Sequence, residues 1–283
     1  MDELTGRTAV VTGAASGIGR SLATRFAREG MSVVLADVEA DALASAAGVV
    51  AELADRDAGG RVVAVQTDVA DAASVEALAV RAFDELGAVH VLCNNAGVFQ
   101  GGVTWERSTA DYEWTLGVNL WGILHGIRSF VPRMLEQGDD AHVVNTISTA
   151  GLATTPFCAP YEVSKFAAAA ATECLAHDLR ARNAPIGVSM LCPGSVDTAI
   201  ARSRRNRPEH LVEPRTDRDA VVEEALARTT GAGAHPDHVA ECVVRAIHED
   251  IFFVPTSEGG ARLLLDRAAA LADGRLPGPA AFD

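Results

Sequence analysis

The sequence has little of what a membrane protein or a nucleic-acid-binding protein requires. No uninterrupted apolar run approaches the roughly 20 residues of a membrane-spanning helix. The opening segment MDELTGRTAVV has no basic stretch that leads into an apolar one. Positive charge is scarce, with 24 Lys and Arg against 38 Asp and Glu and a formal net charge of -14. We therefore expect a cytoplasmic protein that binds neither nucleic acid nor a membrane.

Cysteine is sparse and widely spaced, with single residues at 93, 158, 174, 192 and 242. There is no Cys-x-x-Cys pair and no Cys and His spacing typical of a metal site, so we interpret the thiols as reduced and mostly buried. His235 and His238 lie close together, but the neighbouring Pro236 makes a helix N-terminus the simpler explanation. We expect no bound metal.

The sequence does contain a regular alternation of short β-rich runs and longer helical segments. The β-rich runs are 8–13, 32–37, 61–68, 89–95, 142–148, 186–193 and 251–255, and helical periodicity covers 17–29, 39–56, 71–87, 109–136, 160–183, 236–249 and 258–273. Strands this continuously apolar are typical of a parallel sheet covered on both faces. The pattern predicts an α/β fold with a doubly wound parallel sheet in three layers, α/β/α.

No internal repeat and no low-complexity linker divides the chain, so we predict a single domain over 1–283. In 195–219, Pro, Arg and Asp interrupt any periodicity, which is typical of a lid or binding loop. The expected parts are a core at about 5–198 and 236–256, a substrate loop at about 195–235, and a C-terminal helical extension at about 258–273.

The first strand leads into the glycine-rich turn TGAASGIG, Thr12 to Gly19, which opens the first helix. Its glycines permit a tight turn and a close approach to a pyrophosphate, while the helix N-terminus offers N–H groups to the phosphates. Many such turns need glycine for geometry alone, but the position after the first strand favours a dinucleotide. Asp37 ends the second strand, where a carboxylate binds ribose hydroxyls and repels a 2'-phosphate. The sequence therefore predicts NAD in preference to NADP, although Asp37 also suits a helix N-cap.

The segment YEVSK places Tyr161 and Lys165 four residues apart, so both side chains share one face of a helix. A free tyrosine has a pKa of about 10, too high for a base at neutral pH, and a neighbouring ammonium would favour the phenolate. Ser148 lies thirteen residues earlier, at the end of the fifth strand, where ligands of such sheets bind. The spacing of the Tyr and Lys alone leaves open whether the pair is catalytic or is an exposed lysine near a packed tyrosine.

These motifs occur in a defined order: TGAASGIG, NNAG at 94–97, Asn119, Ser148 and YEVSK. In order and spacing, the chain resembles the classical short-chain dehydrogenase/reductase family from about residue 5 to residue 198. The resemblance implies a Rossmann fold and an NAD-dependent oxidoreductase that transfers a hydride between the nicotinamide and a secondary alcohol or ketone. An epimerase or dehydratase that uses NAD transiently, and a non-catalytic NAD-binding protein, are the alternatives.

The resemblance also implies roles for individual residues. Tyr161 would be the general acid in reduction and the base in oxidation, and Lys165 would tune its pKa and bind the nicotinamide ribose. Ser148 would bond the substrate oxygen, and Asn119 would hold a water that links the lysine to solvent. The implied catalytic set is Asn119, Ser148, Tyr161 and Lys165. The implied cofactor-binding set is Gly13, Ser16, Gly17, Ile18, Gly19, Asp37, Asp68, Val69, Asn95, Ala96, Gly97, Tyr161, Lys165, Pro193, Gly194, Val196 and Thr198. Asn94 we assign to hydrogen bonds that hold the strands.

The substrate is expected to contact Ser148, Phe157 and Tyr161. The run TAGLATTPFCAP, between Ser148 and Tyr161, is mostly apolar, which suggests a fairly hydrophobic substrate, although ordinary loop packing explains it equally well. Further candidate pocket residues are Phe99, Trp105, Leu152, Thr154 and Cys158.

The stretch ARSRRNRPEH is the one locally basic segment, with arginines at 202, 204, 205 and 207. Arginine forks suit carboxylates and phosphates, so an anionic substrate is one interpretation. A solvated loop whose arginines pair with Glu209, Glu213 and Asp217 is favoured. Family members are commonly tetramers or dimers whose interfaces are formed by the helices near 109–136 and 160–183. The resemblance therefore implies a homotetramer or homodimer.

Overall fold

The sheet has seven parallel strands in the order β3-β2-β1-β4-β5-β6-β7. This computed structural model describes residues 1, 3–54 and 60–279. The strands are β1 (Thr8–Thr12), β2 (Ser32–Asp37), β3 (Val62–Gln66), β4 (Val91–Asn94), β5 (Ala141–Thr146), β6 (Ile186–Cys192) and β7 (Phe253–Pro255). The order reverses between β1 and β4, so the sheet is doubly wound as predicted. The carboxyl ends of all strands share one edge, where this architecture binds ligands.

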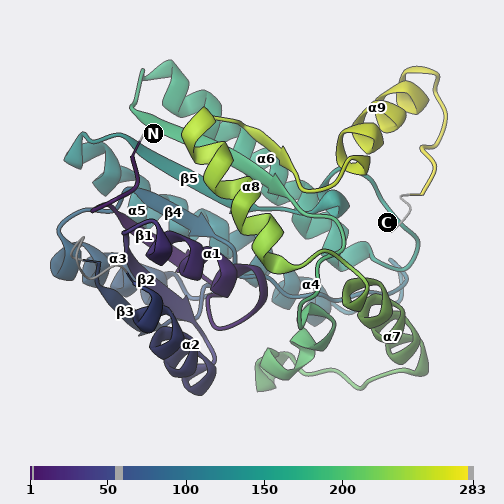
Figure 1. Cartoon of the computed structure of the whole chain (residues 1–283). Helices are drawn as coiled ribbons and strands as arrows, with labels where there is room; N and C mark the ends of the chain where they lie inside the picture. The colour runs from purple at the N-terminus through teal and green to yellow at the C-terminus, as the bar shows by residue number, and fades with distance from the viewer. Residues whose placement is uncertain (2, 55–59, 280–283) are drawn as a thin grey trace.

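Helices cover both faces of the sheet and confirm the predicted three layers (Figure 1). They are α1 (Gly17–Arg28), α2 (Ala40–Leu53), α3 (Ala72–Leu86), α4 (Thr109–Leu116), α5 (Gly122–Gln137), α6 (Ala159–Ala181), α7 (Asp217–Gly231), α8 (Pro236–Glu249) and α9 (Gly259–Ala272). One apolar core joins the sheet to α1, α2 and α8, and a second joins it to α3, α5 and α6. None of these helices combines the length and apolarity that a bilayer crossing needs, within the described ranges.

The central strands are buried along their whole length, as their continuous apolar runs predict. Two buried amides cross this core. Asn94 Nδ2 donates to Asn145 Oδ1 at 2.9 Å, and Asn145 Nδ2 donates to Thr172 Oγ1 at 3.1 Å. These bonds tie β4 to β5 and β5 to α6, which agrees with the strand-holding role expected of Asn94.

The segment 109–136, predicted as one helix, is interrupted. Between α4 and α5 the backbone forms a single π-helical turn, Gly117–Trp121. Asn119 lies in this turn and is fully buried, with its side chain bonded to Val98 and to Ser164. The wider turn lets a polar residue face the sheet, a position that helical periodicity does not reveal.

The expected substrate loop contains a helix that the sequence interpretation missed. After two short 3-10 turns, Ile200–Asn206 and Glu209–Leu211, α7 begins behind a capping box in which Thr216 and Asp219 bond each other's backbone N–H. The pattern Thr-x-x-Asp before an Ala- and Val-containing run is a helix-start signal that was available in the sequence. The C-terminal helix α9 is present as predicted and stands at the edge of the molecule (Figure 1).

Candidate active site

A cavity of about 490 Å³ follows the carboxyl edge of the sheet. Every position of the expected cofactor-binding set lines it, from Gly13 and Asp37 at one end to Tyr161 and Lys165 at the other. Ser148 lines the cavity as well, whereas Asn119 and Phe157 do not. Residues that are far apart in the sequence therefore meet along one channel long enough for an extended ligand.

The glycine turn gives this channel its floor. Gly13 and Gly17 have φ of +66° and +52°, and a Cβ on Gly13 would lie 2.8 Å from the Cα of Ala96. Ser16 is the N-cap of α1, but its side chain makes no capping hydrogen bond. The first N–H groups of the helix are therefore available to a ligand bound in the cavity beside this turn. A diphosphate fits such a turn, because its charge is met by N–H groups and by the helix dipole.

Thr12, which the sequence interpretation did not single out, holds the turn against β4. Its hydroxyl accepts from the backbone N–H of Asn95 at 2.9 Å and of Ala96 at 3.1 Å. Its carbonyl accepts from Asn95 Nδ2 at 2.9 Å, and Thr146 Oγ1 donates to Asn95 Oδ1. Asn95 therefore positions the cavity wall through its side chain.

Asp37 is held firmly at the far end of the cavity. Its Oδ2 accepts from the Ala15 N–H at 2.9 Å and its Oδ1 accepts from the Glu39 N–H at 3.1 Å. The carboxylate can still accept from ribose hydroxyls, because each oxygen has further lone pairs. Other acidic residues line the same cavity, among them Glu39, Asp68, Asp71 and Glu113.

Tyr161, Ser148 and Lys165 lie together at the other end. Lys165 is 2% exposed, and its Nζ donates to the Thr146 carbonyl at 2.9 Å and lies 5.7 Å from the centroid of the Tyr161 ring. Burial lowers the pKa of Lys165 to about 8. Burial also raises the pKa of Tyr161 to about 12, while a hydrogen bond with Ser148 acts in the lowering direction. In the protein alone, burial therefore outweighs the lowering expected from the lysine.

Asn119 lies behind the cavity. Its Oδ1 accepts from the Val98 N–H at 2.8 Å, and its Nδ2 donates to the Val98 carbonyl at 3.0 Å and to Ser164 Oγ at 2.9 Å. The side chain thus joins the π turn to the segment after β4 and to α6, on the helical turn between Tyr161 and Lys165. Its contacts place it as a support for the residues around the site.

Of the candidate pocket residues, Phe99 and Cys158 line the cavity, and the ring centroids of Phe99 and Tyr161 are 5.1 Å apart. Phe157 is 52% exposed at a φ of +69°, and Trp105 is 85% exposed. Neither lines the cavity, nor do Leu152 and Thr154. Apolar lining residues also come from the predicted substrate loop, 195–235, and from the C-terminal extension. They are Ile200, Leu211 and Leu226 of the loop and Leu263 of the extension.

Glu162 is a cavity-lining carboxyl that was missed because it lies inside the YEVSK motif. It is 5% exposed, and its Oε1 accepts from the Thr155 N–H at 2.5 Å. Burial raises the pKa of Glu162 to about 7, against the lowering effect of the bonds from Thr155. The residue therefore fixes the segment between Ser148 and Tyr161 and titrates close to neutral pH.

The basic stretch of the substrate loop folds back onto the protein. Arg207 is buried, and its Nη1 donates to Asp111 Oδ1 at 2.6 Å and to Gln100 Oε1 at 3.2 Å. Arg204 donates to the carbonyl of Glu213, and Arg205 pairs with Glu39. These partners differ from the Glu209, Glu213 and Asp217 side chains that we expected.

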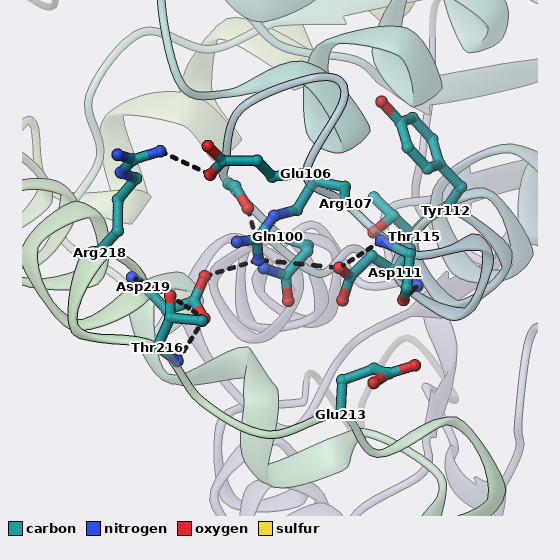
Figure 2. A network of polar contacts seen from close by, with 12 residues as sticks. Gln100, Glu106, Arg107, Asp111, Tyr112, Thr115, Glu213, Thr216, Arg218 and Asp219 are labelled. Atoms are coloured by element: carbon teal, nitrogen blue, oxygen red, sulfur yellow. Dashed lines mark hydrogen bonds and ion pairs between the residues drawn. The ribbon is translucent and has the colours of Figure 1, made fainter.

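A second buried arginine extends this network to α7 (Figure 2). Arg107 Nη1 donates to Asp219 Oδ1 at 2.6 Å and lies 3.7 Å from Asp111 Oδ2. All three side chains are less than one tenth exposed. The substrate loop and α7 are therefore attached to α4 by buried charge pairs.

The geometry agrees with comparisons to known proteins. The family model for short chain dehydrogenase matches residues 7–209. The chain belongs to the short-chain dehydrogenase family. A crystal structure of a short-chain dehydrogenase/reductase from Burkholderia phymatum in complex with NAD superposes on this short-chain dehydrogenase with a TM-score of 0.94 at 40% identity, covering 99% of both chains.

Two curated relatives are also similar over most of their length. The 1-deoxy-11-beta-hydroxypentalenate dehydrogenase of Streptomyces avermitilis is 40% identical over 252 residues, 88% of this chain and 84% of that protein. The CLA biosynthesis dehydrogenase/reductase of Lactiplantibacillus plantarum is 31% identical over 273 residues, 94% of this chain and 93% of that protein. This chain is therefore an oxidoreductase of the short-chain dehydrogenase family. In the part of the chain that the structure describes, no group of His, Cys, Asp and Glu is arranged to hold a metal ion.

Proposed function

We propose that this short-chain dehydrogenase interconverts a fairly hydrophobic secondary alcohol and its ketone, with NAD preferred to NADP. One observation carries the proposal: a single cavity has Asp37 at its adenosine end and Ser148, Tyr161 and Lys165 at its reaction end. An apolar wall adjoins the reaction end. With this arrangement, one cavity can bind a dinucleotide and a carbinol side by side.

In this proposal NAD supplies the hydride acceptor, and the side chains of the chain supply orientation and proton transfer. Ser148 bonds the substrate oxygen and Tyr161 Oη takes its proton during oxidation or returns it during reduction. Lys165, held by the Thr146 carbonyl, provides the positive charge that favours a phenolate and binds ribose hydroxyls. Asn119 supports this set by holding Val98 and Ser164.

The proposed substrate class follows from the cavity wall. Phe99, Ile200, Leu211, Leu226 and Leu263 offer aliphatic and aromatic surface, which suits an apolar body of several carbons. The loop arginines at 204, 205 and 207 are engaged with the protein itself, so an anionic group on the substrate is not required.

The preference for NAD is supported by the charge of the adenosine end. Asp37 would face the ribose, and Glu39, Asp68, Asp71 and Glu113 are further acidic residues that line the same cavity, in addition to Glu162 at the reaction end. A 2'-phosphate dianion placed there meets like charge in a partly desolvated cleft, where electrostatic repulsion is stronger than in water.

We also infer a homo-oligomer in the cytoplasm. Trp121 on the π turn and Val163 on α6 are each about half exposed, and they lie on the helices expected to form the interface. Large apolar side chains left in water on such helices favour association with a second copy. The five thiols are unpaired, which suits a reducing compartment.

The test is net NADH formation by the purified chain with a panel of secondary alcohols of increasing apolar size, run in parallel with NADP. We expect turnover that favours NAD and the larger alcohols. Tyr161→Phe, which keeps the ring, should bind NAD normally and lose about 10²–10⁴-fold in kcat, the range for a lost general acid or base. Wild-type turnover in that variant would remove Tyr161 from the mechanism. Equal use of NADP would refute the proposed preference.

A further inference from the structure

Arg205, on the substrate loop, lines the cofactor cavity, and each of its three guanidinium nitrogens donates a hydrogen bond within the protein. It and Lys165 are the Lys and Arg side chains that line the cavity within the described residues. Its Nη2 donates to Glu39 Oε1 at 2.5 Å and its Nε donates to Glu39 Oε2 at 3.3 Å. Its Nη1 donates to the Arg202 carbonyl at 2.9 Å. No nitrogen of the guanidinium is left uncommitted.

Glu39 is equally engaged. Its Oε1 also accepts from Asn206 Nδ2 at 2.8 Å, so two consecutive loop residues converge on one carboxylate. The hydrogen bond from Arg205 is the largest influence on this carboxyl and lowers its pKa, which keeps it ionised at neutral pH. The positive charge of Arg205 is therefore neutralised at the place where it enters the cavity.

The pair stands beside the carboxylate expected to bind the adenosine ribose. The backbone N–H of Glu39 donates to Asp37 Oδ1, so Arg205 is separated from Asp37 by the length of one glutamate side chain. An unpaired guanidinium at this distance from the ribose is suited to a phosphate at the 2'-position, because its fork matches phosphate oxygens in charge and geometry.

We propose that Glu39 is a second cofactor-selectivity residue, which excludes NADP by occupying Arg205. Asp37 repels the 2'-phosphate directly, and Glu39 neutralises Arg205, a nearby cation that would compensate. The ligand class withheld from the site is a 2'-phosphorylated adenosine. This inference rests on the proposed preference for NAD and adds a residue and a mechanism to it.

The charge of Glu39 can be tested separately from its position. Glu39→Gln keeps an acceptor oxygen for Arg205 and Asn206 but leaves the guanidinium uncompensated. The full chain is titrated calorimetrically with adenosine 2',5'-bisphosphate and with adenosine 5'-monophosphate, so the readout is independent of turnover. We expect Glu39→Gln to bind the bisphosphate about tenfold more tightly, the scale of one charge-assisted contact, and the monophosphate with little change.

Glu113→Gln is the matched control. Glu113 is an exposed α4 carboxylate that lines the same cavity, and it has no ion pair or side-chain hydrogen bond recorded in the described residues. Its substitution removes the same charge without releasing an arginine, so we expect a gain below about threefold, the scale of one screened surface charge. Adding Arg205→Ala to Glu39→Gln should abolish the tenfold gain, whereas Arg205→Ala alone, which leaves the Glu39 carboxylate uncompensated, should weaken bisphosphate binding below the wild-type value.

Equal gains in the Glu39→Gln and Glu113→Gln variants would reduce the effect to general charge and overturn the inference. A gain that survives the loss of Arg205, or no gain at all in Glu39→Gln, would overturn it as well. The proposed function fails by a different result, which is equal affinity of the wild-type chain for NAD and NADP.

Discussion

Substitution of Glu162 tests how much a buried negative charge at the reaction end of the cavity lowers the stability of the protein. Its carboxyl lies almost entirely out of water and accepts one backbone hydrogen bond, from Thr155. Glu162→Gln retains an oxygen for that bond and removes the ionisable group. The variant should therefore be more stable than the wild type whenever the wild-type carboxyl is ionised.

The size of the effect follows from the pKa of Glu162, which burial raises from 4.5 to about 7. Between these two values the folded chain binds more protons than the unfolded chain, so wild-type stability falls as the pH rises. Above pH 7 the full penalty applies, and a shift of this size corresponds to about 3 kcal/mol. Below pH 4.5 the carboxyl is protonated in both states and the penalty vanishes.

The assay is urea unfolding of the wild type and Glu162→Gln at about pH 5 and about pH 8, with the free energy of unfolding taken from linear extrapolation. We expect the variant to gain about 2–3 kcal/mol at the higher pH and much less at the lower. The exposed Glu249→Gln serves as the control and should change stability by less than about 0.5 kcal/mol at both. A gain for Glu162→Gln that is the same at both pH values would refute the reasoning.

Three further substitutions test other parts of the structure. Asp111→Asn leaves Arg207 and Arg107 buried without their shared carboxylate, so the free energy of unfolding should fall by about 3–5 kcal/mol in chemical denaturation. A fall below about 1 kcal/mol, as for an exposed ion pair, would contradict this. Lys165→Met removes a buried ammonium whose pKa is lowered to about 8. The free energy of unfolding of the cofactor-free protein should therefore rise by about 1–3 kcal/mol below pH 8 and by less as the pH approaches 10.5, while turnover is lost. A loss of stability at neutral pH would contradict this. Leu263→Ala widens the apolar wall and should raise KM for the bulkiest alcohol by about tenfold, with little change for a small one, as initial rates would show.

Much of the fold could be predicted because the strands carry their own signal. Each central strand is buried on both faces and is therefore apolar throughout, and all seven strands of the described residues end within two residues of the expected position. The helix α7 escaped prediction because Pro and Arg residues precede it and because only two of its residues, Asp219 and Thr230, are buried. A helix with so small a buried face lacks strong apolar periodicity, and its capping box is the clearest local sign.

The residues expected to bind the cofactor could be predicted to line one cavity, because they lie at the ends of strands and at the start of α1, where topology decides the location. Individual side chains near the substrate were harder to predict. The backbone of Phe157 adopts a left-handed conformation that no periodicity indicates, and its half-exposed side chain does not line the cavity. The contact between Glu39 and Arg205 joins residues 166 positions apart, and only the folded loop brings them together.

The buried charge pairs between α4 and α7 affect more than stability. Because the ion pair between Arg107 and Asp219 holds the first turn of α7, Leu226 and Thr230, seven and eleven residues later, line the cavity without having to anchor the helix. Attachment and recognition are thus assigned to different turns along one face of the helix. Residues that contact the substrate can therefore be substituted while the attachment of α7 is kept. Substrate specificity could change in this way without loss of order in the active site.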